Sequence, residues 1–413
     1  MALNHITFQR QNGGMGRTAA SEDPVSGLLL GMNSAVVSTS SVLTPFASLV
    51  VGSVTLYVAT LKYYEQLEAT YGITRTEASD DITAEQAAKN FIDYHVSEFF
   101  KHSPSGTLYL AVKLTGDVLP AEISAMQNYA GGKIRQVGIA AAGTAAITAE
   151  QLTGYQTEAG SLETNHMPLS ILVAQRKGAY DDIGDITAVN LSLADRRNVS
   201  VLISQDLDAT LQAEQNSSKL NEVAAIGTLL GCVSAASVNE SIAWVQKFPV
   251  EMKAPGFVTG DLLKETTTTN LNLLNDNRYI FVRSHVGVSY VYFNDSHTLD
   301  VSTSDYAYIE NVRTMDKATR GIRANMLPYL NAPLDVDATS GHLRADTVAA
   351  LETVVGKALE EMEKAGELSG YSAVIDPDQN VLSTSEVTVV IRNVAVGVMR
   401  QVKVKIGFTT SLS

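Results

Sequence analysis

The chain has 413 residues, of which 45% are hydrophobic and 18% charged, so it carries enough apolar material for folded cores and is not a disordered chain. Its 30 basic and 44 acidic residues give a formal net charge of −14, which excludes a general attraction to nucleic acid. The single cysteine, Cys232, excludes an intrachain disulfide and a cysteine-based zinc site. A typical domain size of ~150 residues predicts two or three domains.

The first 22 residues predict an extended arm. A short alternating piece is followed by a run of residues 12–17 that holds too many glycines for a regular element. The alternating positions are Ile6, Thr7 and Phe8. The glycines that we interpret as an arm hinge are Gly13, Gly14 and Gly16. Because this start lacks a basic region followed by an apolar run, it does not resemble a secretory signal, and we expect assembly in a cytoplasm.

Residues 23–104 contain small apolar residues followed by two helical patterns. Apolar residues recur at helical spacing from 57 to 71, and this pattern stops at Gly72. A second helical pattern follows Asp81 or Thr83, either of which can cap its start.

From residue 107 onward short apolar runs alternate with helical segments. The runs predict strands at 107–112, 134–140, 169–174 and 199–204, with helices at 120–130, 148–158 and 183–194 and a closing helix at 220–246. Strands separated by helices require crossover connections, so we expect a mainly parallel sheet in an α/β domain at 105–250. The apolar stretches 50–61 and 224–238 are short of the ~20 residues that span a bilayer, so no direct membrane insertion is expected.

The last third of the chain predicts a second unit. A polar linker at 251–275 precedes a hairpin near 279–293, two long helices at 305–327 and 344–366, and strands at 371–375 and 388–391. The C-terminal residues 401–408 alternate polar with apolar side chains at a period of two, which is typical of a half-buried strand. The apolar positions of this arm strand are Val402, Val404, Ile406 and Phe408. Such a strand either folds back onto its own domain or pairs with another chain.

No pattern in the sequence selects an enzyme or a cofactor site. The run Gly13-Gly14-Met15-Gly16 lacks the Gly-Lys-Ser/Thr ending and the preceding strand of a phosphate-binding loop. The seven histidines are scattered without metal-ligand spacing, and a Gly-x-Ser-x-Gly motif is missing. We therefore predict no cofactor, no metal and no catalytic residue.

One face of the helix at 305–327 is basic. Four cations follow at spacings of four, three and three residues, opposite to an apolar face. They are Arg313, Lys317, Arg320 and Arg323. This stripe is interpreted either as a solvated surface or as a contact with an acidic partner.

Several stretches together resemble contractile phage tail sheath proteins of the type found in Bacteroidetes phages and prophages, and the related sheaths of phage-derived injection systems. The stretches nearest the C-terminus are 366–371, 375–377, 379–382 and 406–408. Those nearer the N-terminus are 67, 72–74, 94–100, 198–206, 225–231 and 238–245.

This resemblance implies a structural subunit of a tail sheath, found in a virion tail or in an injection particle. Its copies form a homo-oligomer of stacked rings or a helix around a tail tube protein, with baseplate and tail terminator proteins at the ends. Terminal arms of neighbours add strands to each core domain, and the sheath contracts without nucleotide hydrolysis. We take the basic stripe as the candidate contact with the tube, which is a hypothesis from helical geometry because the resemblance supplies no residue match for it. Nucleic acid is not among the expected partners.

The resemblance also implies an α/β fold class with an α+β core domain, an inserted α/β domain and two arms. The expected ranges are an arm at 1–22, core at 23–104, an outward insertion at 105–250, a linker at 251–275, tube-proximal core at 276–399 and an arm at 400–413. Two other interpretations stay open: a tube or baseplate protein, and a metabolic α/β enzyme, which the pattern at 107–246 alone would fit.

Overall fold

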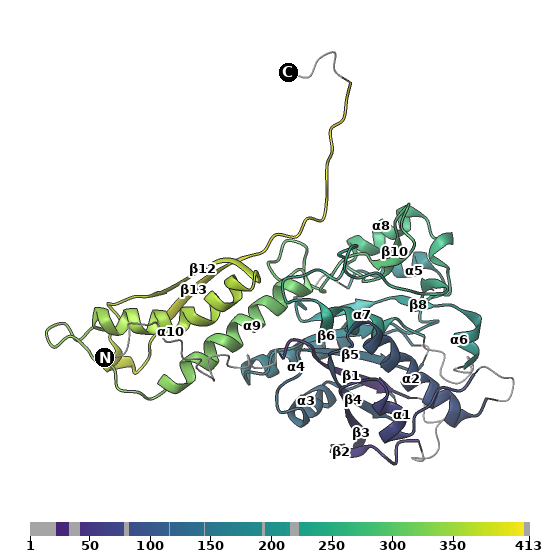
Figure 1. Ribbon diagram of the computed structural model, residues 1–413, viewed down its shortest axis with the longest axis horizontal. Coiled ribbons are helices and arrows are strands. Elements are labelled where there is room, and N and C mark those ends of the chain that lie inside the picture. The colour runs from purple at the N-terminus through teal and green to yellow at the C-terminus, as the bar shows by residue number, and fades with distance from the viewer. Residues whose placement is uncertain are drawn as a thin grey trace, which may run out of the picture.

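The computed structural model describes residues 22–32, 42–77, 82–114, 116–143, 145–191, 195–214 and 223–408. The predicted N-terminal strand and its glycine hinge lie outside these residues. Within them the chain forms a large body built on a seven-stranded sheet and a narrower C-terminal unit beside it (Figure 1).

The large sheet confirms the predicted α/β fold class. Its strand order is β2-β3-β4-β1-β5-β6-β7. The bounds are β1 Val25–Gly31, β2 Ala47–Val51, β3 Val54–Leu61, β4 Thr107–Lys113, β5 Gln136–Ala141, β6 Ser170–Ala174 and β7 Val199–Leu202. The strands from β4 to β7 in this order run parallel, whereas β3 is antiparallel to β4 and β2 to β3. The sheet is therefore mainly parallel, with an antiparallel edge.

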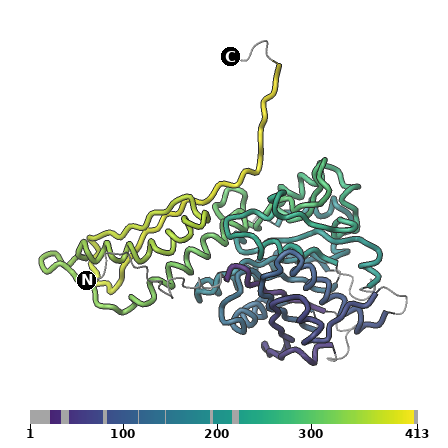
Figure 2. Tube along the Cα trace, viewed as in Figure 1, coloured from purple at the N-terminus to yellow at the C-terminus, as the bar shows by residue number. Residues whose placement is uncertain are grey.

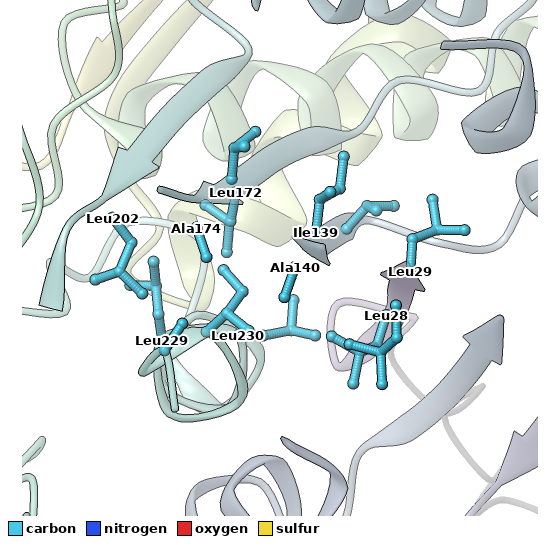
Figure 3. Close-up of a cluster of buried hydrophobic side chains, with 14 of the residues drawn as sticks. Leu28, Leu29, Ile139, Ala140, Leu172, Ala174, Leu202, Leu229 and Leu230 are labelled. Carbon is cyan, nitrogen blue, oxygen red and sulfur yellow. The ribbon is translucent and has the colours of Figure 1, made fainter. Parts of the chain in front are cut away.

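Helices cover both faces of this sheet (Figure 1), which is why the central strands β1 and β5 are buried almost throughout. The helices of the body are α1 Gln66–Tyr71, α2 Ala84–His102, α3 Pro120–Tyr129, α4 Ala149–Thr164, α5 Ile183–Ala188, α6 Ala209–Glu214 and α7 Ile226–Ala235. Leu229 and Leu230 of α7 face strand residues such as Ala140 (Figure 3). On the other face, Met126 of α3 packs against Gly27 of β1. Sheet and helices together bury one continuous core.

Two glycines let α7 lie directly against α2. A Cβ at Gly227 would stand 2.3 Å from the carbonyl oxygen of His95, and one at Gly231 would stand 2.7 Å from that of Phe99. Glycine at both positions thus allows a backbone-to-backbone approach. The helix covers 10 residues and ends at Ala235, so it is much shorter than the predicted closing helix at 220–246.

The first strands of the chain belong to the same sheet as the α/β region. β1 is central, between β4 and β5, and β3 pairs with β4. The border expected at residues 104 and 105 therefore does not separate two sheets. The first residues of the expected helical segment 57–71 are strand, because β3 runs to Leu61, and the helix α1 covers only Gln66–Tyr71.

The expected linker at 251–275 is structured. It contains β9 Pro255–Phe257, which pairs with β8 Ser204–Asp206, then η1 Leu263–Glu265 and most of α8 Thr268–Asp276. Leu263 and Leu274 are buried in the main core. The predicted hairpin follows as β10 Val282–Ser284 and β11 Val291–Phe293, which pair antiparallel.

The C-terminal unit is built from two long helices and a two-stranded sheet. The elements are α9 Ile309–Met326, η2 Leu327–Tyr329, α10 Ala345–Lys364, β12 Leu368–Ile375, α11 Val381–Thr384 and β13 Val389–Ala395. Both predicted long helices are thereby confirmed. Two small clusters hold the unit together, one around Leu359 and one around Leu351. Gly321 lies close enough to Ala358 that an added Cβ would stand 2.9 Å from the Cβ of Ala358.

Candidate assembly interface

The C-terminal segment leaves the protein as an extended trace. Residues 396–408 have no assigned element, and the trace runs away from both units (Figures 1 and 2). The predicted apolar positions in it are exposed: Val402 is 66% exposed, Val404 77%, Ile406 95% and Phe408 111%. Within the described residues the strand does not fold back onto its own domain. Four large apolar side chains on one face of a strand are thus left in water.

The two-stranded sheet β12–β13 offers two free edges. The strands are antiparallel, with Ile375 opposite Val389 at one end and Leu368 opposite Ala395 at the other. Leu368 and Ile375 are buried, while Val374, Val390 and Val394 are exposed on the outer face. Because this sheet has two strands among the described residues, each strand keeps one edge of backbone N–H and C=O groups without a neighbouring strand.

Arg400 fixes the point where the C-terminal segment departs. Its guanidinium donates to both carboxylate oxygens of Asp295, at 3.2 and 3.0 Å, and to Glu310 at 2.5 Å. It also lies over the ring of Tyr308, 3.4 Å from the centroid, as in a cation–π contact. Beside it lies a groove of about 640 Å³ between residues 239–245, the β10–β11 hairpin region and residues 396–400.

Burial and charge act in opposite directions at this anchor. Burial alone would lower the pKa of Arg400, but Asp295 and Glu310 together raise it. Burial raises the pKa of Glu310, and the nearby Arg400 counteracts that shift. The guanidinium therefore stabilises a carboxylate that is 2% exposed, which explains why the segment is held at this residue.

The basic stripe of α9 mostly faces the interior of this chain. Arg313 is 4% exposed and donates to the carbonyl oxygen of Ala236, at 3.2 Å from each of two guanidinium nitrogens. Lys317 pairs with Asp23 and Glu367, and Arg320 with Asp23. Arg323 is exposed. The solvated surface expected for the stripe is therefore not found for its first three cations, and the tube contact stays a prediction.

Sequence reasoning missed the residues that receive these cations. Asp295 and Glu310 are 105 and 90 residues from Arg400 in the chain, and Asp23 is 294 residues from Lys317. A pattern at short spacing cannot reveal such pairs. The predicted basic face of the helix was the one signal for these partners, because cations clustered on an acidic chain are expected to pair with carboxylates.

The described residues also bear on the other kinds of site. They contain no group of three His, Cys, Asp or Glu side chains placed to hold a metal ion. Among them, no helix is long and apolar enough to cross a membrane. Cys232 is fully buried, and burial raises the pKa of its thiol.

The fold resembles that of chains in two contractile injection particles. One structure is described as the anti-feeding prophage (AFP) baseplate, 6-fold symmetrised, with a TM-score of 0.58, 13% identity and coverage of 100% of both chains. The other is the PVC sheath complex of an extracellular contractile injection system in the contracted state, with a TM-score of 0.60, 11% identity and coverage of 100% of this chain and 98% of that one. At such identities the similarity concerns the fold.

The curated proteins contain no match to this chain. Residues 305–413 match the sequence profile described as DUF2586, C-terminal domain, and residues 3–297 match the one described as DUF2586, N-terminal domain. The two profiles meet just before α9, where the sheet body gives way to the C-terminal unit. The chain therefore belongs to the DUF2586 family.

Proposed function

We propose that this protein is a structural subunit of a contractile tail sheath, which polymerises around a tail tube by exchanging terminal strands with its neighbours. The observation that carries the proposal is the C-terminal strand, whose apolar residues Val402 to Phe408 stand in water in the single chain. The likeness in fold to a chain of a contracted sheath complex supports it.

Strand addition would pair the backbone groups of both the small sheet and the C-terminal segment. The free edges of β12 and β13 present unpaired backbone groups, and the C-terminal strand presents the same groups along residues 401–408. An extended segment that adds to a sheet edge gains main-chain hydrogen bonds and places alternate side chains against the sheet. The donor of one copy then fits the acceptor edge of the next, which generates an open polymer when the contact does not close on itself.

The proposed role is structural and not catalytic. In this interpretation the energy of contraction is stored in the packing of the subunits, which have two stable arrangements, and the arms keep the copies linked during the change. The proposed partners are further copies, the tail tube protein, and the baseplate and terminator proteins. The proposed location is a virion tail or injection particle assembled in the host cytoplasm.

Negative-stain electron microscopy of the purified protein tests this function. The full chain should form striated hollow cylinders, whereas a chain that ends after Arg400 should stay as small oligomers with an unchanged unfolding temperature. Cylinders of normal length from the shortened chain would contradict strand exchange through the C-terminal arm.

A baseplate subunit is the second candidate, because one chain of similar fold comes from a baseplate. A sheath subunit extends into long polymers, but a baseplate subunit stops at a discrete ring. A single closed ring at all protein concentrations would therefore favour the baseplate role.

A further inference from the structure

The root of the N-terminal segment is fastened to the middle of α9. Glu22 and Asp23 are the first described residues, and Asp23 stands two residues before the central strand β1. Lys317 donates to Asp23 at 2.6 Å, and a guanidinium nitrogen of Arg320 lies 3.6 Å from the other carboxylate oxygen. The side chain of Asp23 is 16% exposed, so these pairs are partly shielded from water.

The root of the C-terminal segment is fastened to the first turn of the same helix. Arg400 donates to Glu310 at 2.5 Å, and its ring partner Tyr308 is the residue at which α9 is capped. Glu310 and Lys317 are seven residues apart, which is about 10 Å along the helix axis at a rise of about 1.5 Å per residue. The two arm roots are therefore fastened to the same helix about two turns apart.

Two further contacts tie this stretch of α9 to its surroundings. Arg313, between Glu310 and Lys317, donates to the carbonyl oxygen of Ala236, the residue that caps the C-terminal end of α7. A cation is favourable there because the end of a helix carries a partial negative charge. Lys317 also donates to Glu367 at 2.5 Å, one residue before β12.

We propose that the first half of α9 transmits tension directly between the two arm roots of each subunit. This inference rests on the proposed function, in which the arms link neighbouring copies. Along the covalent chain, a pull on the N-terminal arm enters β1 at the centre of the sheet and crosses the whole body before it reaches residue 400. Through the ion pairs, the same pull passes from Asp23 to Lys317, along α9 to Glu310 and out through Arg400.

This route protects the fold when the polymer is strained. The route through the ion pairs spans two turns of one helix, whereas the covalent route loads the seven-stranded sheet that holds the main core. An α-helix carries a load along its axis through its covalent backbone and its i to i−4 hydrogen bonds. In this inference the cations of the basic stripe connect α9 to other parts of the same chain.

Single-molecule pulling on the full chain, held at its two ends, tests the inference without any polymer. The variants are Lys317→Met, which keeps the length of the side chain but removes both ion pairs, and Arg400→Met. We expect the unfolding rate of the sheet body at constant force to rise at least tenfold in each variant. The conservative variant Lys317→Arg should restore most of the resistance.

The matched control is Lys364→Met, which removes an exposed ion pair with Glu360 on α10. Equal unfolding rates at force for Lys317→Met, Arg400→Met and Lys364→Met would overturn the inference. Thermal unfolding without force identifies a variant that is merely unstable. In that case the test is whether Lys317→Arg restores the resistance to force, and a failure to restore it would also overturn the inference. If the wild-type chain forms no polymer, the proposed function fails, while the pulling experiment still reports on the route through α9.

Discussion

Replacing the last two apolar residues of the C-terminal strand should separate assembly from folding. In the double variant Ile406→Ala and Phe408→Ala, both side chains are 95% or more exposed in the single chain. They contribute nothing to the core of their own subunit. Substitutions at such positions usually change the free energy of unfolding by no more than about 0.5 kcal/mol. The unfolding temperature of the monomer should therefore stay the same.

The effect on assembly should be large. Full burial of an aliphatic or aromatic side chain contributes about 1.5–3 kcal/mol, so the four apolar residues of the strand supply roughly 6–12 kcal/mol when they dock. Ordering the eight residues of the strand costs roughly 8–16 kcal/mol. Backbone hydrogen bonds must therefore offset the rest of the ordering cost, so the net free energy of docking is small. Losing two side chains removes about 3–6 kcal/mol, which raises the critical concentration about 100-fold or more, since each 1.4 kcal/mol is a factor of ten.

Light scattering and sedimentation over a dilution series measure this critical concentration, and thermal unfolding of dilute protein measures the stability of the monomer. The control variant is Lys403→Ala and Lys405→Ala, which changes the opposite face of the same strand. A critical concentration within threefold of the wild type would refute docking of the apolar face. So would a clear fall in the unfolding temperature, because the two side chains would then be packed in their own subunit.

Three further predictions concern the body of the subunit. Gly227→Ala should destabilise the fold by about 1–3 kcal/mol, because its Cβ would meet the carbonyl oxygen of His95, whereas Gly160→Ala, with open space around it, should be neutral or stabilising in the same urea titration. Lys113→Met should lower the free energy of unfolding by about 3–5 kcal/mol, because it leaves the buried carboxylate of Glu122 without its cation. Adding Glu122→Gln should recover part of that stability. Burial lowers the pKa of His95 to about 3 and those of His102 and His297 to about 4, so only the unfolded chain binds protons there as the pH falls from about 6.5. Stability should then fall by about 1.4 kcal/mol per histidine for each pH unit down to about 4, and a His95→Phe variant with an unchanged slope would contradict this.

The sequence predicted the elements whose signal is local. The strands β4 to β7 and the long helices α9 and α10 carry uninterrupted apolar periodicity, and the structure confirms them. The segment from 57 to 71 was misjudged because Tyr57 and Leu61 fit a helical spacing. Their strand partners on β4, Val112 and Leu108, lie 55 and 47 residues further along the chain. Pairing between distant strands is decided by tertiary contacts that a local window does not contain.

The pattern behind the predicted C-terminal arm strand is local as well, and the strand stays a prediction because residues 396–408 have no assigned element. Its alternation at 402–408 is a pattern of two-residue period, and the exposure of all four apolar residues agrees with a strand that has no partner in its own chain. The anchor at Arg400 was not predictable, because Asp295, Tyr308 and Glu310 reach it only once the body and α9 have folded together.

The basic stripe shows that a helical projection has to be combined with the net charge of the chain to predict what a charged face contacts. A helical projection places Arg313, Lys317 and Arg320 on one face but does not say what that face meets. In a chain with 14 more acidic than basic residues, a cluster of cations is as readily matched from within as by a partner. The carboxylates that match it are Asp23, two residues before β1, and Glu367, one residue before β12. The charge pattern therefore joins the start of the large sheet to the start of the small one, and α9 is the helix that pairs with Asp23, Glu367 and Arg400.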